Sequence, residues 1–318
     1  MRVSRARVLE PLRVRSVLLP LDGSALAEQG IPTAAAVARK ARARLRLALV
    51  HQSPSPPPRD EGTARMYTRI ELALRKSERD YLRGVARRIK EKSAIQVATA
   101  TLSGSPAPAL LDYVREVGVD LVVMTTHGRG GLQRAWLGSV ADQLVRTVEI
   151  PLLLIRPAEG APTPTSEPVL EEILVPLDGS RRAEAALPSA TGVAKLFGAG
   201  LLLVQCVQPV AIAIGHPGVY PSALGETILA DRRRQAQDYL DDMTGTIHEL
   251  GVPAISTTVL AASAVDGILA ASRGPKIGLI ALATHGRGGL RRLVLGSVAD
   301  KLVRTADLPV LVTRPRGK

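Results

Sequence analysis

The chain has 318 residues, of which 46% are hydrophobic and 2% aromatic, so it is long enough for about two domains with aliphatic cores. Cys206 is the single cysteine, which excludes intrachain disulfides and cysteine-based metal sites. No apolar run reaches the roughly 18 residues that span a bilayer, and no apolar segment follows the basic N-terminus as it would in a signal peptide. We therefore expect a cytoplasmic protein.

The formal net charge of +13 comes from 34 Arg and 8 Lys against 29 acidic residues. The arginines are spread along both halves, with Arg232 to Arg234 as the one run of three, and few aromatic residues are present to stack on bases. We expect most of this charge to be a solvated surface, so nucleic-acid binding is not predicted. The excess would favour anionic ligands such as nucleotides.

After a basic extension, residues 1–14, the first half alternates apolar strand-like runs with helical patterns. The predicted strands are residues 15–21, 45–50, 95–102, 120–125 and 151–155. The predicted helices are residues 25–42, 63–92, 106–117 and 139–147. The longest of them has an amphipathic pattern, with an apolar side made of Ile70, Leu74, Tyr81, Val85 and Ile89.

Residues 158–168, rich in proline and threonine, have the composition of a linker, and the pattern then starts again. The predicted strands of the second half are residues 173–177, 201–207, 254–260, 277–283 and 309–313, and its predicted helices include residues 183–197, 224–250 and 264–272. Between residues 126–157 and 284–315, 22 of 32 aligned positions are identical. The chain is therefore a tandem duplication, with domains at residues 1–157 and 169–318.

Alternating strands and helices predict an α/β fold, with two tandem Rossmann-like domains that each hold a five-stranded parallel sheet with helices on both faces. In such sheets ligands bind beyond the carboxyl ends of the strands, where the strand order reverses. That edge would carry Asp22 and the loop 125–131 in the first domain. It would carry Asp178 and the loop 283–289 in the second.

The two loops share Thr-His-Gly-Arg-Gly-Gly-Leu, followed by Leu-Gly-Ser-Val-Ala-Asp. Glycines between a strand and a helix can turn backbone N–H groups toward phosphate, and the helix N-terminus adds partial positive charge. The alternative is a turn that only joins strand to helix. His127 and His285 have no acid, base or nucleophile at a fixed spacing, so we interpret them as loop hydrogen-bonding residues and predict no catalytic residue and no metal site.

Three motifs occur in the same order in both halves: Pro-Leu-Asp-Gly-Ser after the first strand, the glycine-rich loop, and a closing apolar strand. Together they resemble the universal stress proteins over nearly the whole chain, which is similar to a tandem member. The resemblance implies the adenine nucleotide alpha hydrolase-like form of the fold and a role in stress response. It also implies pairing of the last strands, residues 151–155 with 309–313, within the chain or in a homodimer.

The nucleotide-binding branch of that family has Gly, two residues, Gly, nine residues, Gly, then Ser or Thr. The last three positions match Gly128, Gly138 and Ser139 in the first half. Thr125 and Ala283 stand where the first glycine would be. The resemblance implies ATP as ligand, or AMP or ADP, with Mg²⁺ accompanying ATP. The first half also keeps the family's Gly-x-Pro at residues 104–106, which the second half lacks at residues 262–264, so we expect the first site to be better preserved.

The resemblance assigns the adenosine end to the aspartates, the adenine contact to strand-two backbone, and the phosphates to the glycine loop and helix start. In the first half the implied nucleotide-binding residues are Pro20, Asp22, Leu47, Thr125, Gly128, Arg129, Gly131, Gly138, Ser139 and Val140. In the second half they are Pro176, Asp178, Leu201, Ala283, Gly286, Arg287, Gly289, Gly296, Ser297 and Val298.

Several alternatives stay open from the sequence. Asp22 and Asp178 fit helix N-caps as well as ligand contacts, and Arg129 and Arg287 fit solvated side chains. The function is either a stress protein regulated by an adenine nucleotide, with at most slow hydrolysis, or a nucleotide-independent adaptor whose loops are relics. A dedicated nucleotide-hydrolysing enzyme is a third, weaker hypothesis.

Overall fold

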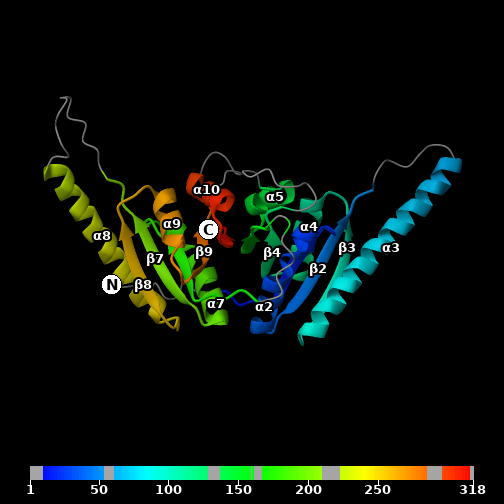
Figure 1. Cartoon of the computed structure of the whole chain (residues 1–318), viewed down its shortest axis with the longest axis horizontal. Helices are drawn as coiled ribbons and strands as arrows, with labels where there is room; N and C mark the ends of the chain where they lie inside the picture. Colours follow the sequence, from blue (N-terminus) through cyan, green and yellow to red (C-terminus); the bar gives the residue numbers. More distant parts are fainter. Residues whose placement is uncertain are drawn as a thin grey trace, which may run out of the picture. The chain divides into compact units, whose positions relative to one another are not determined.

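The computed structural model describes residues 10–53, 61–127, 137–158, 160, 167–209, 223–284 and 296–315. The chain forms two compact units (Figure 1). The first unit runs from Arg13 to Pro168, and the second starts at Val169 and also takes in the described residues that precede Arg13. Among the described helices, none combines the length and the apolar content that crossing a membrane requires.

The sheet of the first unit has the order β3-β2-β1-β4-β5, with all neighbouring strands parallel. Its strands are β1 (Ser16–Leu21), β2 (Arg44–His51), β3 (Val97–Ser103), β4 (Leu121–Thr125) and β5 (Leu152–Ile155). Its helices are α1 (Ala25–Glu28), α2 (Ile31–Ala41), α3 (Glu61–Lys92), α4 (Pro106–Val117) and α5 (Ser139–Thr147). The order reverses between β1 and β4, which is where such sheets bind ligands.

The second unit repeats this plan with the order β8-β7-β6-β9-β10, again parallel. Its strands are β6 (Glu172–Pro176), β7 (Gly200–Cys206), β8 (Ile255–Leu260), β9 (Ile277–Ala283) and β10 (Val310–Thr313). Its helices are α6 (Arg181–Glu184), α7 (Leu187–Phe197), α8 (Ala223–His248), α9 (Ala264–Ser272) and α10 (Ser297–Thr305). The predicted α/β fold with two five-stranded parallel sheets is confirmed.

The central strands are the most deeply buried part of each unit. Val17, Leu19 and Leu121 of the first sheet have no exposed surface, because helices cover both faces of a parallel sheet and its strands read as continuous apolar runs. Ile173 and Leu174 of β6 are equally buried. The cores are aliphatic, as the scarcity of aromatic residues predicts.

One helix predicted in each half is in fact two. The prediction of a single helix over residues 25–42 is wrong, because α1 ends at Glu28 and α2 begins at Ile31. Pro32 lacks the N–H that would bond to the carbonyl of Glu28, so a continuous helix cannot pass this point. Pro188 has the same effect between α6 and α7.

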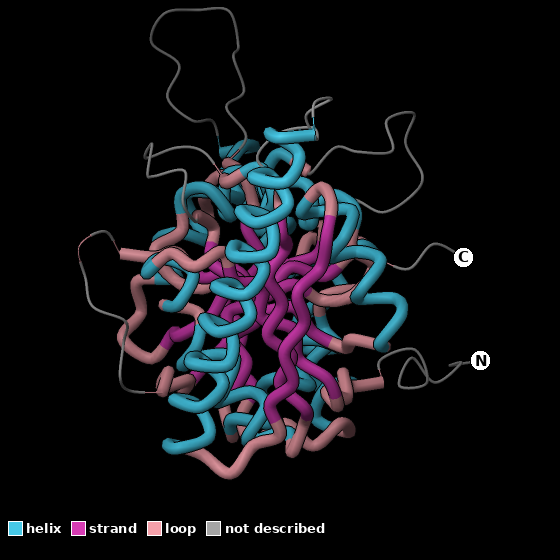
Figure 2. The backbone as a smooth tube through the Cα atoms, turned by 90° about the vertical axis from the view of Figure 1, so that its right-hand side faces the viewer, coloured by secondary structure: helices cyan, strands magenta, loops and turns pink. Residues whose placement is uncertain are grey.

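The apolar side predicted for α3 is buried only over its second half. Leu82, Val85 and Ile89 are buried, whereas Ile70 is 43% exposed and Leu74 is also exposed. Figure 2 shows α3 lying over the strands of its sheet, and Figure 1 shows its first turns extending past their ends. The first turns of the helix therefore continue its apolar pattern past the ends of the strands.

Chain segments outside the strands and helices pack closely on both units. The Leu12 N–H donates to the Pro188 carbonyl at 2.8 Å, and a Cβ atom added at Gly192 would lie 2.5 Å from the Leu12 carbonyl oxygen. In the first unit, the Gln29 side chain makes two hydrogen bonds of 2.8 Å to the Ala158 backbone. Segments that sequence composition marks as an extension and a linker therefore have specific partners.

Gly192 provides a test of the packing around Leu12. We expect Gly192→Ala to lower the free energy of unfolding by about 1–3 kcal/mol, because the added methyl collides with backbone atoms. Gly245→Ala, in a helix where nothing lies within 4 Å of the added Cβ, should instead raise it by about 0.5–1 kcal/mol. Urea denaturation of both variants measures the difference. Stabilisation by both substitutions would contradict the close approach of Leu12 to α7.

Candidate functional site

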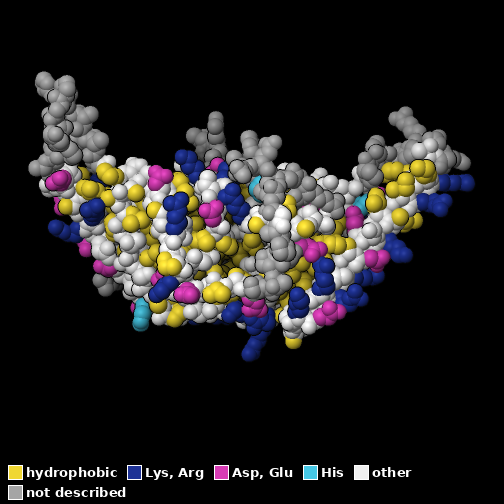
Figure 3. All heavy atoms as spheres, in the orientation of Figure 1, with side chains coloured by type: hydrophobic (Ala, Val, Ile, Leu, Met, Phe, Trp, Pro, Cys, Tyr) yellow, Lys and Arg dark blue, Asp and Glu magenta, His cyan; other side chains and the backbone are white. Residues whose placement is uncertain are grey.

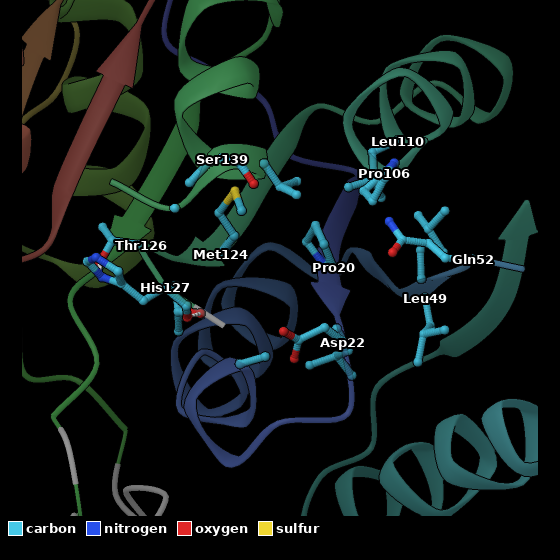
Figure 4. A pocket seen from close by; sticks show the side chains of 18 of the residues that line it. Pro20, Asp22, Leu49, Gln52, Pro106, Leu110, Met124, Thr126, His127 and Ser139 are labelled. Atoms are coloured by element: carbon cyan, nitrogen blue, oxygen red, sulfur yellow. Dashed lines mark hydrogen bonds between the residues drawn. The ribbon is translucent and has the colours of Figure 1, made fainter. Parts of the chain in front are cut away.

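A cavity of about 660 Å³ opens at the carboxyl ends of β1, β2 and β4 in the first unit. Figure 4 shows Pro20 and Asp22 between Ser139 on one side and Leu49 and Gln52 on the other. Its size falls within the usual range for small-ligand sites. The described residues around it include Pro20, Leu21, Asp22, Ala48, Leu49, Val50, Gln52, Glu78, Pro106, Leu110, Met124, Thr125, Thr126, His127, Gly138, Ser139 and Val140.

Asp22 lines this cavity and also shapes the turn after β1. Its Oδ1 atom accepts hydrogen bonds from the Ser24 N–H at 2.9 Å and from the Ser24 hydroxyl at 2.6 Å. Ser24 is the N-cap of α1 and accepts from the Ala27 N–H at 3.1 Å. In the second unit Asp178 accepts from Ser180, which caps α6. The serines are the caps, and the aspartates hold them in place from the cavity wall.

Thr125 stands at the end of β4, where the nucleotide-binding signature has its first glycine. Its hydroxyl donates to the His127 carbonyl at 2.8 Å, and the Thr126 hydroxyl lies 3.0 Å from Nδ1 of His127. Thr125 is buried and its polar atom is satisfied within its own turn. A larger residue than glycine is therefore accommodated while the cavity remains open.

Gly138 brings the start of α5 against the end of β4. Its N–H donates to the Thr126 carbonyl at 2.9 Å, and a Cβ atom added there would lie 2.9 Å from that same oxygen. Only glycine allows this approach. Gly138 is the N-cap residue of α5 and has no side chain to cap the helix. Ser139 and Val140 of the first turn line the cavity, so a helix N-terminus, which is suited to anions, lies at its wall.

The remaining predicted residues divide into three groups. Leu47 and Leu201 are fully buried in their sheets and line neither cavity, because the cavity starts further along β2, at Ala48. Pro20, Pro176 and Ala283 do line the cavities. Gly128, Arg129, Gly131, His285, Gly286, Arg287 and Gly289 lie outside the described residues.

The second unit has a corresponding cavity of about 530 Å³ with a different lining. Pro176, Asp178, Ala283 and Val298 line this cavity, whereas the predicted Gly296 and Ser297 do not. Gly296 is the N-cap of α10 and has nearly the backbone angles of Gly138. Its lining also includes Cys206, at the place that corresponds to Val50 of the first cavity, and Arg181 and Arg182, which have no counterpart among the described lining residues of the first cavity. Burial raises the pKa of the Cys206 thiol.

The loops after the third strands differ as the sequence suggests. Gly104 has a φ of +110°, which favours glycine, and Pro106 lines the first cavity. In the second unit Ala264 lines the cavity instead. The Cys206 Sγ lies 3.8 Å from its carbonyl. The first cavity thus keeps a backbone feature that the second has lost.

Sequence reasoning missed a buried cluster beside the first cavity. His51, at the end of β2, is 2% exposed, and its Nδ1 lies 2.9 Å from Glu78 while its Nε2 lies 2.7 Å from Glu71. Glu78 also lines the cavity. The signal in the sequence is a histidine that ends a strand, followed by two glutamates seven residues apart on one helix face.

Glu71 is the most heavily bonded member of this cluster. It also accepts from the Ser53 hydroxyl and from Arg75 Nε, each at 3.1 Å. Burial by itself would raise the pKa of Glu71, but the hydrogen bonds from His51, Arg75 and Ser53 together lower it. The cluster anchors α3 to β2. Within the described ranges no three His, Cys, Asp or Glu side chains are placed to hold a metal ion.

Comparison with known proteins gives consistent matches. The model of the universal stress protein family matches twice, at residues 13–156 and 170–314. Universal stress protein Rv2005c of Mycobacterium tuberculosis is 31% identical over 236 residues, which cover 73% of this chain and 71% of that protein. Universal stress protein Rv1996 of the same species is 28% identical over 279 residues, covering 80% and 81%.

A solved structure agrees with the fold of the chain. The crystal structure of a universal stress protein from Archaeoglobus fulgidus has a TM-score of 0.68, with 94% of this chain and 98% of that chain covered. The two sequences are 19% identical, so this similarity concerns the fold alone.

The bonding of Glu71 predicts how stability changes with pH. Because its pKa is lower in the folded chain, the ionised carboxylate stabilises the fold above the unfolded pKa, and this contribution is lost as the pH falls through the folded pKa. We expect the free energy of unfolding to decline between about pH 5 and pH 3, and to decline less steeply in Glu71→Gln. Denaturant titrations along a pH series measure both slopes. Glu116→Gln, an exposed carboxyl on α4, should keep the wild-type slope, and an unchanged slope in Glu71→Gln would refute the assignment.

Proposed function

The chain belongs to the universal stress protein family, and we propose that it binds ATP or a related adenine nucleotide as a regulatory ligand in a stress response. The observation that carries this proposal is the position of the first cavity. It lies at the switch point between β1 and β4 and is bordered by the N-terminus of α5, whose N-cap residue Gly138 has no capping side chain. An anionic group in that cavity would meet backbone N–H donors with the favourable end of a helix dipole behind them.

The phosphates of the nucleotide would lie at the start of α5. The N–H groups of Ser139 and Val140 are suitable donors, and the Ser139 hydroxyl can add another. Gly128, Arg129 and Gly131 complete the proposed phosphate contacts, and Mg²⁺ would offset the charge of ATP. Because Asp22 and Glu78 line the same cavity, a cation would also reduce repulsion between their carboxylates and the phosphates.

The adenosine would occupy the opposite end, near Pro20 and the end of β2. Asp22 is placed to accept hydrogen bonds from ribose hydroxyls. For the adenine we propose backbone of Val50 in place of Leu47, because the last β1 partner is Leu21, opposite Leu49. Val50 lines the cavity one residue beyond that pair, so its backbone has no β1 residue opposite it in the ladder.

We propose that the first unit holds the better site. Its cavity is larger and keeps Pro106. In the second cavity Cys206 takes the place that corresponds to Val50, and Arg181 and Arg182 change its charge. We assign no catalytic residue in either cavity and propose at most slow hydrolysis of the nucleotide.

Partners and location follow the same family reasoning. Strands β5 and β10 are each at one end of their own unit's strand order, and strand edges with unpaired backbone favour pairing. We propose that these strands pair with each other within the chain or between two copies, and that the protein acts in the cytoplasm.

Calorimetric titration with ATP tests the proposal, and proline substitutions locate the site. Gly138 has a φ of −56° and a ψ of 147°, a conformation that a following proline permits, and proline is tolerated at the first helical position. Ser139→Pro therefore removes one N–H without breaking α5. We expect it to weaken ATP binding about 10- to 100-fold, as the loss of a hydrogen bond to a charged group should.

Matched variants separate the contributions. Ser139→Ala removes the hydroxyl alone and should cost less affinity than Ser139→Pro. Ser297→Pro makes the same change in α10, where Gly296 has a φ of −60° and a ψ of 146°, and should leave the stronger binding event intact. Binding unaffected by either proline would place the nucleotide elsewhere. Absence of binding by folded wild-type protein would favour the nucleotide-independent adaptor.

A further inference from the structure

One side of α3 carries a row of exposed cations. Arg65, Arg69, Lys76 and Arg79 are exposed, and alternating steps of four and three residues place them, with Leu72 between them, in one row along the helix. We call this row, together with the exposed apolar side chains of Met66, Ile70 and Leu72, the outer face of α3. Figure 3 shows Lys and Arg side chains along the outer margin of this helix.

Exposed apolar side chains lie in the same part of the helix. Met66 is 63% exposed, Leu72 60% and Ile70 43%. Among the described residues, the large hydrophobic side chains with this degree of exposure all lie on α3, apart from Val169. Between residues 62 and 77 the one acidic residue is Glu71, which bonds inward to His51. The first half of the outer face is therefore apolar and cationic together.

The duplicated helix α8 shows that this character is specific to α3. Each long helix packs on the third strand of its own unit, α3 on β3 and α8 on β8. Residues 61–92 contain ten cationic and five acidic residues, a net charge of +5, whereas residues 223–248 contain three and five, a net charge of −2. A general excess of arginine in the chain would have affected both helices. The positive charge of α3 is therefore specific to this helix and does not follow from the composition of the chain.

We propose that the outer face of α3 binds the surface of an anionic lipid membrane. Arginine and lysine beside exposed apolar residues on a helix suit this surface, because anionic headgroups attract the cations while the apolar side chains enter the boundary of the acyl region. A nucleic acid would use the cations but would leave Met66, Ile70 and Leu72 in water. The second half of α3 is held by Leu82, Val85 and Ile89 in the core, so the helix would lie on the membrane as a peripheral contact.

Cosedimentation of the full chain with vesicles tests this inference independently of nucleotide binding. We expect the protein to bind phosphatidylcholine vesicles that contain 30% phosphatidylglycerol, to bind pure phosphatidylcholine weakly, and to dissociate as salt is raised. The triple variant Arg65→Gln, Arg69→Gln and Lys76→Gln should lower the partition coefficient about 100-fold, from about fivefold for each cation near the surface. A second triple variant, Met66→Ser, Ile70→Ser and Leu72→Ser, should also lower it and should leave the remaining binding fully salt-sensitive.

The run of arginines on α8 supplies the matched control. Arg232, Arg233 and Arg234 are all exposed, and their replacement by glutamine removes the same charge from the chain, so binding should change less than twofold. An equal loss in this control would show nonspecific attraction and overturn the proposal. So would failure to bind the anionic vesicles at low salt. If the protein bound duplex DNA more tightly than vesicles, and this binding depended on the α3 cations but was unchanged by the serine substitutions, the ligand of the outer face would be nucleic acid and the proposal would be wrong.

Discussion

The candidate site depends on one close approach between backbone atoms. The N–H of Gly138 reaches the carbonyl of Thr126 at 2.9 Å, and any side chain at residue 138 would meet that oxygen. This contact places the first turn of α5 beside the end of β4, at the point where the strand order of the parallel sheet reverses. Gly138, the N-cap residue, has no side chain that could cap the helix, and Ser139 and Val140 of the first turn line the cavity. Glycine here is a requirement of geometry, and the position of the helix N-terminus at the cavity wall follows from it.

The two units show how one frame can carry two different sites. Their strand orders agree, and Gly138 and Gly296 have nearly the same backbone angles. The linings have diverged at the strand and helix ends, where Cys206 and the arginines of α6 change the second cavity. Such changes cost little, because residues at strand ends are less constrained by the sheet than those in its interior. A duplicated fold can therefore keep the geometry of this helix start while the lining of its cavity changes.

The sequence was sufficient for the strands, the parallel topology and the duplication, since apolar periodicity is a local signal. The break between α1 and α2 could also have been predicted, because Pro32 forbids the hydrogen bond that would join them. Two features depended on tertiary position. Leu47 was expected to contact the ligand because the family resemblance assigns the adenine to the backbone of strand two, but the register with β1 places the cavity beyond it. His51 meets Glu71 and Glu78 only once α3 has packed on the sheet.

The first half of α3 is a second place where the sequence pattern did not show tertiary position. Ile70 and Leu74 continue the apolar spacing of Val85 and Ile89, so periodicity treats all four as one buried side, yet the first two are exposed. The net charge of the whole chain does not show where the cations gather. Because both halves contain many arginines, it conceals the difference in charge between α3 and α8. The structure separates the exposed apolar residues of α3 from the buried ones, and it shows which of the exposed residues lie near the cations. Glu78, which lines the cavity, belongs to the same helix, and His51 ties it to β2. The cavity wall and the outer face are therefore two sides of a single anchored element.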